Sequence, residues 1–576
     1  MTASDHPPAA AQNRGLLAGG ISLCAAVLFL LLLPVSFDVA DDVGSQMILA
    51  GLDGFAATAD VPFHSYALSQ LLYYLYQLVP AVAWYGVLVM ATTVVGCSLW
   101  LRILLDSQLS RVDRWICSPA LLGLLAHCLY SPTFTSAALL CQLGAFLCLL
   151  HAPDRQLDDR ANQLGLLGLL VLAALWRWQL VCYCLALLLP LVIARPQIWR
   201  LAAGLAVGTL IVVAADRAIH RQTHTAPDWQ QYEEFYQLRA TFHDRPAGRD
   251  PNAAAFQAAA WTQDDYAMFR QLWVIHDDQL FNTNRLERFL AANQQGRTVS
   301  WQGLSARLLQ TLRDNALALR IIVPTLLALF LHQLASGGWQ PSDVRRRYIL
   351  ALFLASLPLL YLLYFRLVPR VAIPLLLFGV SLLLLLGQSH RRDKGHGSMR
   401  LPRYLVYLGV ALAVTSTAWM VVQEIQQQRL AQQQLAQVDE ALTRLAAEHP
   451  VATLLRMNTG GGLRHAAMHP LKFPAGFRKL RIIPAGWQTG SPRYQAILRE
   501  LRVESGRQLL ESAVASGEIV LVDFVEQPSQ AAETRRLWES YYDRNLVLST
   551  GTSIWLEPVI GSPEEPGLVV YRIRRH

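Results

Sequence analysis

Three carboxylates, Asp38, Asp41 and Asp42, directly follow an apolar run of the chain at residues 16–37. Acidic groups at the end of a membrane-length segment are costly to bring near hydrocarbon unless they are hydrated or have a function. A carboxylate beside an acceptor hydroxyl can act as a general base, and a pair of carboxylates can also hold a divalent cation. The alternative interpretation is a hydrated loop that simply begins with acids.

A second group of candidates is basic. Arg177 lies between two tryptophans, and Arg366 and Arg370 flank Pro369, each at the predicted apex of a helical hairpin. An arginine at membrane depth needs a partner, and the phosphate of a lipid fits its planar guanidinium well. The alternatives are anchoring at the membrane interface and an ion pair with an acidic loop residue. We therefore treat the three arginines as candidate phosphate ligands.

Two further sites have side chains suited to sugars. His64 follows Phe63 and can bind hydroxyls or phosphate, or help Asp41 and Asp42 hold a metal ion; the alternative is a packed, hydrogen-bonded histidine. The polar region 216–316 contains aromatic residues next to carboxylates, and its candidate substrate ligands are Trp261, Asp264 and Asp265. Rings stack on the C–H faces of sugars and acids bind their hydroxyls, but the same residues also suit an interfacial helix with a solvated face.

The composition shows which elements must position these residues. Hydrophobic residues make up 53% of the 576 residues and charged residues only 16%. Eleven apolar runs approach the length needed to cross hydrocarbon about 30 Å thick, and they lie near residues 16–37, 79–104, 115–130, 135–151, 163–176, 179–194, 198–215, 317–336, 348–364, 368–388 and 404–423. The net charge of +8 resides largely in short loops, without the basic stripe that indicates nucleic-acid binding. The sequence thus predicts a mostly α-helical, polytopic transmembrane bundle.

The charges of the loops predict the topology. Arg14 precedes the first run, and the compact Lys/Arg clusters of later loops all fall on that side when the runs alternate. We expect a cytoplasmic tail at residues 1–15 and a bundle at residues 16–423. The external loops 38–78 and 216–316 and the chain after residue 423 would be periplasmic. Richness in Ala, Leu, Arg and Trp favours a bacterial inner membrane.

Three pairs of runs are short for two full crossings: residues 115–151, 163–194 and 348–388. At about 1.5 Å per residue their apices stop below the outer surface, where they would line a cavity open to the periplasm. In the second pair the turn is expected at residues 176–179. The competing interpretation is a single tilted helix in which Arg177 reaches back to the interface.

Two polar regions complete the chain. Region 216–316 predicts short amphipathic helices on the outer leaflet, because aromatic rings favour the interface. Residues 424–576 predict a Gln-rich helix followed by a small extracytoplasmic α/β domain. The patterns indicate strands at 451–457, 480–483, 518–525 and 567–573 and helices at 492–501 and 504–515.

The first external loop carries a resemblance. From Asp41 the chain reads DDVGSQMILAGLDGFAATADVPFHSYALSQLLYYLYQLVPAVAWYG. An acidic pair, an amphipathic stretch, an aromatic-His corner and a Leu/Tyr-rich helix in this order resemble the first external loop of the GT-C superfamily. These are integral-membrane glycosyltransferases that use polyprenyl- or dolichyl-phosphate-linked sugars. The resemblance implies a helical bundle with horizontal helices at its external face and a C-terminal α/β domain.

The resemblance also implies roles. A catalytic Asp in this loop would make Asp41 or Asp42 the base, with Asp38 slightly early and a candidate substrate ligand. Basic residues of external loops would hold the donor phosphate, a role that matches Arg177, Arg366 and Arg370. The expected reaction is an inverting transfer from a polyprenyl-phosphate sugar to a glycan, lipid or protein acceptor at the periplasmic face. A divalent cation is the one cofactor that the acids leave open.

Two other functions fit the same architecture. A polymerase or ligase of lipid-linked polysaccharide would depend on external basic residues, here Arg239, His243 and Arg245. A non-enzymatic transporter or assembly protein would use the bundle as a pathway or as an anchor for the C-terminal domain. A transporter is expected to place charged or broken elements in the middle of helices in both halves, whereas the charge here concentrates at external apices.

Overall fold

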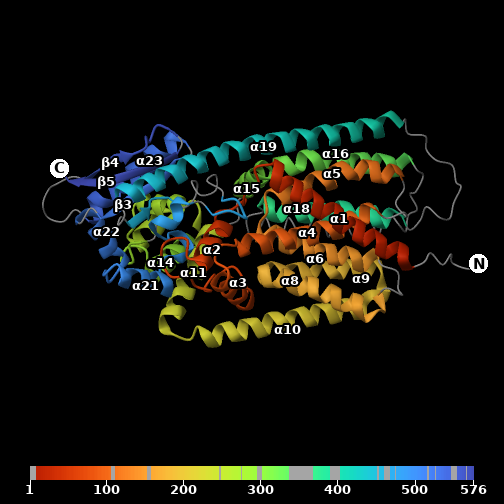
Figure 1. Ribbon diagram of the computed structural model, residues 1–576, viewed down its shortest axis with the longest axis horizontal. Coiled ribbons are helices and arrows are strands. Elements are labelled where there is room, and N and C mark those ends of the chain that lie inside the picture. Colours follow the sequence, from red (N-terminus) through yellow and green to blue (C-terminus); the bar gives the residue numbers. More distant parts are fainter. Residues whose placement is uncertain are drawn as a thin grey trace, which may run out of the picture.

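A computed structural model describes most of the chain. The described residues are 8–105, 111–151, 157–245, 248–273, 276–294, 301–335, 368–388, 403–449, 453–458, 468–473, 475–515, 518–525, 527–546, 554–565 and 567–575. The molecule is elongated, with a helical bundle at one end and a small sheet at the other (Figure 1). The predicted run at residues 348–364 and Arg366 lie outside the described residues.

The bundle contains ten of the described helices. They are α1 (Pro8–Leu32), α4 (Trp84–Leu104), α5 (Arg111–Tyr130), α6 (Phe134–His151), α8 (Arg160–Cys184), α9 (Leu188–Ala194), α10 (Trp199–Thr223), α16 (Ala316–Ala335), α18 (Pro369–Gln388) and α19 (Arg403–Glu448). By length and composition, five stretches of the described residues can cross a membrane: parts of α1, α4, α6, the α8–α9 stretch and α10. Helices α5, α16, α18 and α19 cover four more of the predicted runs.

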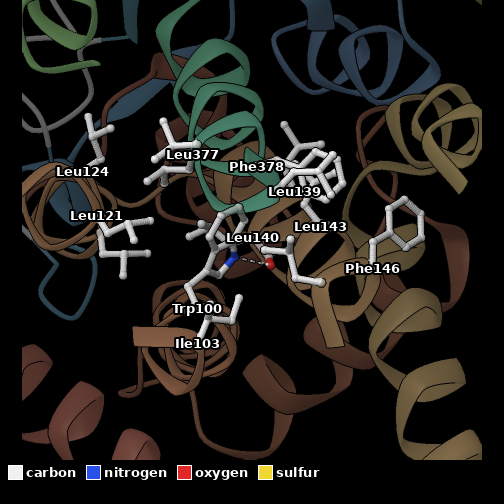
Figure 2. Packing of buried hydrophobic residues seen from close by; sticks show 14 of the residues in the cluster. Trp100, Ile103, Leu121, Leu124, Leu139, Leu140, Leu143, Phe146, Leu377 and Phe378 are labelled. Carbon is white, nitrogen blue, oxygen red and sulfur yellow. Dashed lines mark hydrogen bonds between the residues drawn. The ribbon is translucent and has the colours of Figure 1, made fainter. Parts of the chain in front are cut away.

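Large apolar side chains close the centre of the bundle. Trp100 of α4 is completely buried and donates its indole N–H to the Leu140 carbonyl of α6 at 3.0 Å. Leu377 and Phe378 of α18 pack over the same helices (Figure 2). Since a buried indole needs an acceptor for its N–H, this bond fixes how α4 and α6 sit against each other.

The chain turns back at Arg177, as the hairpin interpretation predicts. Arg177 has φ −151° and ψ 69°, which break the helical geometry inside α8. Beyond this point Gln142 of α6 bonds to the Val181 carbonyl at 2.9 Å, and Arg195 bonds to the Leu149 carbonyl at 3.0 Å. The segment after Arg177 therefore runs alongside α6, back toward the end of the bundle where α8 began.

Short helices cover the sheet-side end of the bundle. They are α2 (Ala40–Ala50), α3 (Tyr66–Leu78), α11 (Pro227–Asp244), α12 (Ala253–Ala259), α13 (Gln263–Ala267), α14 (Thr283–Gln294) and α15 (Trp301–Asp314). Trp261 and Phe269 of this region are buried and share one hydrophobic core with the C-terminal domain. The expectation that these rings lie in the membrane interface is therefore wrong, because the domain covers them.

The C-terminal domain is an α/β sheet layer with the strand order β2-β1-β3-β5-β4. Its strands are β1 (Thr453–Arg456), β2 (Arg481–Ile483), β3 (Ile519–Val525), β4 (Ile554–Ile560) and β5 (Gly567–Arg575), and its helices are α21 (Pro492–Glu500), α22 (Gly506–Ala515) and α23 (Pro528–Asn545). Strands β2, β1 and β3 pair in parallel. Strand β5 pairs antiparallel with β3, and β4 pairs antiparallel with β5. Four strands and two helices lie where the sequence predicts them, whereas β4 and α23 were not predicted.

Helix α19 joins the two ends of the molecule without a break. Its 46 residues include both the predicted span at 404–423 and the predicted Gln-rich helix (Figure 1). Leu442 and Leu445, near its end, are buried in a core that also includes Val520 and Val522 of β3. A continuous helix transmits the position of the bundle to the domain far better than a flexible linker would.

A buried ion pair fixes the domain on the first external loop. Arg493 of α21 contacts Asp53 at 2.8 Å, and their side chains are only 7% and 5% exposed. Arg493 also donates to the Ala56 carbonyl at 3.2 Å, while the Ile482 N–H of β2 donates to the Asp53 carbonyl at 2.8 Å. Side-chain and backbone bonds thus connect the domain to the segment that follows α2.

We expect Asp53→Ala to destabilise this junction strongly. Removing one partner leaves Arg493 as an uncompensated buried charge, at a cost of about 3–5 kcal/mol. The measurements are the melting temperature of the purified protein and the rate at which a protease releases the C-terminal domain. The double variant Asp53→Ala/Arg493→Met is the control and should recover part of the loss. Wild-type melting and protease resistance in Asp53→Ala would contradict the role of the pair.

Candidate active site

Helix α2 presents the two predicted catalytic acids in its first turn. The chain is extended at Val39, and the helix begins at Ala40, so Asp41 and Asp42 are its second and third residues. Negative side chains are favourable there because they face the positive end of the helix dipole. The sequence placed these acids after the first apolar run; the structure shows that they begin a helix rather than a solvated loop.

Asp42 is completely buried and binds two neighbouring elements. Its Oδ1 accepts the Tyr85 hydroxyl at 2.8 Å and the Phe134 N–H at 3.0 Å. Phe134 is the first residue of α6, so the carboxyl group caps a helix whose first N–H groups lack helical partners. Burial raises the pKa of Asp42 to about 8, although both hydrogen bonds oppose this shift. Among the described residues nothing bonds to Oδ2.

The raised pKa predicts a pH dependence of stability. Between the ordinary value of 3.8 and about 8, folded Asp42 keeps a proton that the unfolded chain has lost. The stabilisation is complete below the lower value, and it declines as the pH rises through this window, by up to about 1.4 kcal/mol per pH unit. Asp42→Asn imitates the protonated form at every pH, so its free energy of unfolding should fall less steeply across this window. Melting curves of both proteins from about pH 5 to 9 check this, and parallel curves would contradict it.

Asp41 is the accessible acid. Its side chain is 30% exposed, and its Oδ2 lies 4.0 Å from Nη2 of Arg370, the second residue of α18. This separation is too long for a hydrogen bond, so the two side chains interact through their charges alone. Among the described residues this is the one ion pair of Arg370, whose side chain is 27% exposed. A partly exposed carboxylate therefore lies beside a partly exposed cation at one end of the bundle.

Arg177 approaches the same place from the hairpin apex. Its guanidinium lies 5.6 Å from the centre of the Phe63 ring and 5.2 Å from that of Phe134. Two aromatic faces hold a cation without using its hydrogen-bond donors on a carboxylate. Both Arg177 and Asp41 act electrostatically on Tyr236 and on Asp244 of α11. The first loop, the hairpin apex and α11 therefore surround one charged region.

A small pocket with too little room for a water molecule lies next to Arg370. Its lining includes Asp38, which follows α1, and Ser131, Thr133 and Ser136 at the turn from α5 into α6, together with apolar residues and Arg370 itself. Asp38 is partly exposed and acts electrostatically on His127. The structure thus brings Asp38 close to Arg370, and a substrate role of Asp38 stays a prediction.

His64 is packed beneath the site. It is 2% exposed, and its ring nitrogens lie 3.4 Å from the Trp176 carbonyl and 3.3 Å from Ser45 Oγ. Burial lowers the pKa of His64 to about 3, and the charge of Arg177 acts in the same direction. A neutral, enclosed imidazole supplies no positive charge to a phosphate. Aromatic rings of Tyr85, Phe134 and Trp176 enclose His64, which favours the alternative interpretation of a packed, hydrogen-bonded histidine.

The predicted sugar ligands of region 216–316 lie elsewhere. Trp261 is 4% exposed and donates its indole N–H to the Leu280 carbonyl at 3.0 Å, so it packs as a core residue. Asp264 contacts Arg536 at 3.2 Å, and Asp265 contacts Arg544 at 3.2 Å, both on α23. Asp265 also caps α13 through Thr262. These acids bind α23 of the C-terminal domain, and nothing in the sequence indicates this contact.

The basic residues of the polymerase hypothesis are mostly enclosed. Arg239 is 1% exposed and donates to the Gly486 and Trp487 carbonyls at 2.7 and 2.9 Å. His243 stacks on Trp273 with ring centres 3.5 Å apart and is buried. Arg245 is exposed at the end of α11. Two of the three are therefore enclosed, each by a different set of neighbours.

Several residues of the site escaped the sequence analysis. Phe63, Phe134 and Tyr85 orient Arg177 and Asp42, and Tyr236 and Asp244 bring α11 to the site. An aromatic residue next to His64 was visible, but nothing local indicated that it contacts an arginine more than a hundred positions away. Among the described ranges, no group of three or more His, Cys, Asp or Glu side chains is placed to hold a metal ion.

Comparison with known proteins finds similar structures but no similar sequence. No family model and no curated protein sequence matches this chain. Among solved structures it is similar to ArnT from Cupriavidus metallidurans in the apo state, with 14% identity, a TM-score of 0.39 and coverage of 98% of both chains. ArnT from the same organism bound to undecaprenyl phosphate gives 13% identity, a TM-score of 0.39 and coverage of 96% of this chain and 97% of that chain.

Proposed function

We propose that this protein is a membrane glycosyltransferase that moves a sugar from a polyprenyl-phosphate donor to an acceptor hydroxyl. The observation that carries the proposal is the pairing of Asp41 with Arg370 at 4.0 Å, both of them partly exposed. It gains support from Arg177, which aromatic rings hold beside the same charged region. One accessible base and two cations are the groups that displacement of a lipid phosphate requires.

The residues divide the reaction between them. Asp41 accepts the proton of the acceptor hydroxyl, whose oxygen forms a bond to the anomeric carbon of the sugar. The bond from that carbon to the phosphate oxygen breaks, and its electron pair leaves with the polyprenyl phosphate. Arg370 and Arg177 stabilise the negative charge that develops on the phosphate. A single displacement inverts the anomeric configuration and needs no covalent enzyme intermediate.

The buried acid has a different role in this proposal. Asp42 cannot reach an acceptor, because it is enclosed and its Oδ1 already accepts two hydrogen bonds. It fixes the first turn of α2 against Tyr85 and α6, and thereby directs Asp41 outward. The geometry thus favours Asp41 as the base and Asp42 as a positioning residue.

The membrane placement belongs to the same proposal. The apolar helices support a membrane protein, and the charges of the loops favour an inner membrane with the N-terminus in the cytoplasm. Asp41, Arg370 and the C-terminal domain would then face the periplasm. A donor with a polyprenyl tail would approach from the lipid and bring its phosphate to the bundle end.

Turnover of lipid-linked sugars by the full-length protein in lipid nanodiscs tests this function. We expect release of undecaprenyl phosphate from at least one of a panel of radiolabelled undecaprenyl-phosphate hexoses and pentoses when a bacterial envelope extract supplies acceptor hydroxyls, with the label transferred to an acceptor and inverted at the anomeric carbon. Repeating the assay with EDTA tests the open question of a divalent cation. Failure of the protein to bind undecaprenyl phosphate, together with no turnover of any donor, would overturn the proposal.

A further inference from the structure

A loop of the C-terminal domain reaches the helix that carries Asp41. The turn Gly486–Gln488, directly after β2, places Trp487 against the first external loop. A Cβ atom on Gly44 would lie 3.3 Å from the indole of Trp487, so the ring occupies the face of α2 at that position. Gly44 follows Asp41 by one helical turn and therefore lies on the same side of α2.

The same indole contacts the aromatic residues that hold Arg177. The rings of Trp487 and Phe63 are 4.8 Å apart with an interplanar angle of 73°. Phe63 in turn lies 5.6 Å from the guanidinium of Arg177. Trp487 thus lies between the α2 face that bears the proposed base and the ring that carries a proposed phosphate ligand, although it belongs to another domain.

The backbone of this loop is held from two sides. Arg239 of α11 donates to the Gly486 and Trp487 carbonyls, and the Tyr232 hydroxyl donates to the Trp487 carbonyl at 2.7 Å. On the other side, Arg493 donates to Gln488 Oε1 at 3.1 Å. Gly486 has φ +74°, a conformation that glycine adopts without strain. Burying a guanidinium is costly, so a completely enclosed Arg239 indicates a loop that must keep its position.

The side chain at the centre of this framework is left partly exposed. Trp487 keeps part of its surface open, and among the described residues its indole N–H has no acceptor. A partly exposed indole whose N–H has no acceptor among the described residues is suited to a sugar, because C–H groups pack on such a ring and a hydroxyl can accept the N–H.

We propose that Trp487 is the platform for the sugar ring of the donor and that Arg239 is the residue that positions it. This inference rests on the proposed function and deepens it: the C-terminal domain supplies part of the substrate site. Arg177 and Arg370 would bind the phosphate that all donors share, and Trp487 would bind the sugar that distinguishes a donor from the bare lipid phosphate.

Binding measurements that compare two probes test the proposal. The probes are undecaprenyl phosphate and undecaprenyl phosphate linked to glucose, mannose or galactose, titrated into the full-length protein in nanodiscs. We expect wild type to bind at least one sugar-bearing lipid about tenfold more tightly than the bare lipid, since stacking and a hydrogen bond together give this magnitude. Trp487→Ala should abolish this preference without changing the affinity for undecaprenyl phosphate, and Trp487→Phe should keep most of it.

The affinity for a sugar-bearing lipid relative to that for undecaprenyl phosphate also tests the role of Arg239. Arg239→Gln should lower the sugar preference as Trp487→Ala does, and Arg239→Lys should restore part of it by donating to one of the two carbonyls. Melting curves identify any variant that fails to fold. Trp199, which is 55% exposed on α10, provides the matched control, and Trp199→Ala should bind as wild type does.

The outcomes separate this inference from the proposed function. If wild type binds undecaprenyl phosphate but shows no preference for any sugar, the platform is overturned while the lipid-phosphate site stands. The same conclusion follows if folded Trp487→Ala retains the full preference. If wild type binds neither probe, both the proposed function and the platform are overturned.

Discussion

Asp41→Asn is expected to lower sugar transfer by about 10²–10⁴-fold while leaving the fold intact. The magnitude is that of a lost general base, because asparagine cannot accept the proton of the acceptor hydroxyl. Asp41 is partly exposed and makes only a long contact with Arg370, so its replacement removes little packing. The measurement is the initial rate of transfer from a lipid-linked sugar at saturating donor, with the affinity for undecaprenyl phosphate measured in parallel.

Asp42→Asn is the matched control for this experiment, one position along the same helix. The asparagine retains an oxygen that can accept from Tyr85 and Phe134, so we expect a smaller loss of activity than in Asp41→Asn. The reverse order, with an active Asp41→Asn and a folded but inactive Asp42→Asn, would assign the base to Asp42. Full activity in both variants would remove the acids from the mechanism.

Arg370→Ala is expected to weaken the binding of undecaprenyl phosphate by about 10- to 100-fold. A hydrogen bond to a charged group is worth about 1.5–3 kcal/mol, which corresponds to this range of affinity. Arg177→Ala should have an effect of the same order, because Phe63 and Phe134 hold this guanidinium without neutralising it. Titration of the lipid phosphate into each variant in nanodiscs gives the dissociation constants.

Arg444→Ala controls for the loss of one positive charge. Arg444 lies on α19, is 68% exposed and pairs with Glu440 on the same helix, so its removal should leave lipid binding unchanged. Arg370→Lys retains the charge but not the planar fork and should fall between wild type and alanine. Equal affinities in wild type, Arg177→Ala and Arg370→Ala would place the phosphate elsewhere in the molecule.

Much of the fold was predictable because its signals are local. Apolar runs long enough to span the membrane, and alternating strand patterns in the last part of the chain, arise from neighbouring residues. Strands β1, β2, β3 and β5 therefore lie where the pattern predicts them. Strand β4 and helix α23 lack such signals, since β4 has mixed burial and contains Pro558, and α23 is rich in polar residues.

The candidate site was predictable only in part. The acids after Phe37 and the arginine between two tryptophans stand out by residue type, and the structure brings Asp41 and Arg370 together. His64 and Trp261 show the opposite case, because residue type alone does not distinguish a ligand from a buried residue. Arg239 was a catalytic candidate of the alternative hypothesis, yet its partners are two backbone carbonyls more than two hundred residues away.

The sequence by itself determined where the chain is apolar and that acidic side chains follow the first span. It also determined that a small α/β domain follows the last span. These properties depend on the local periodicity of side chains and on the cost of placing charge in hydrocarbon. Only the tertiary structure decided that Asp41 is partly exposed and Asp42 is enclosed, and that the domain brings Trp487 to α2. Adjacent residues of one helix differ in this way because their burial depends on α6, α18 and the C-terminal domain, which are distant in sequence and meet only in the folded protein.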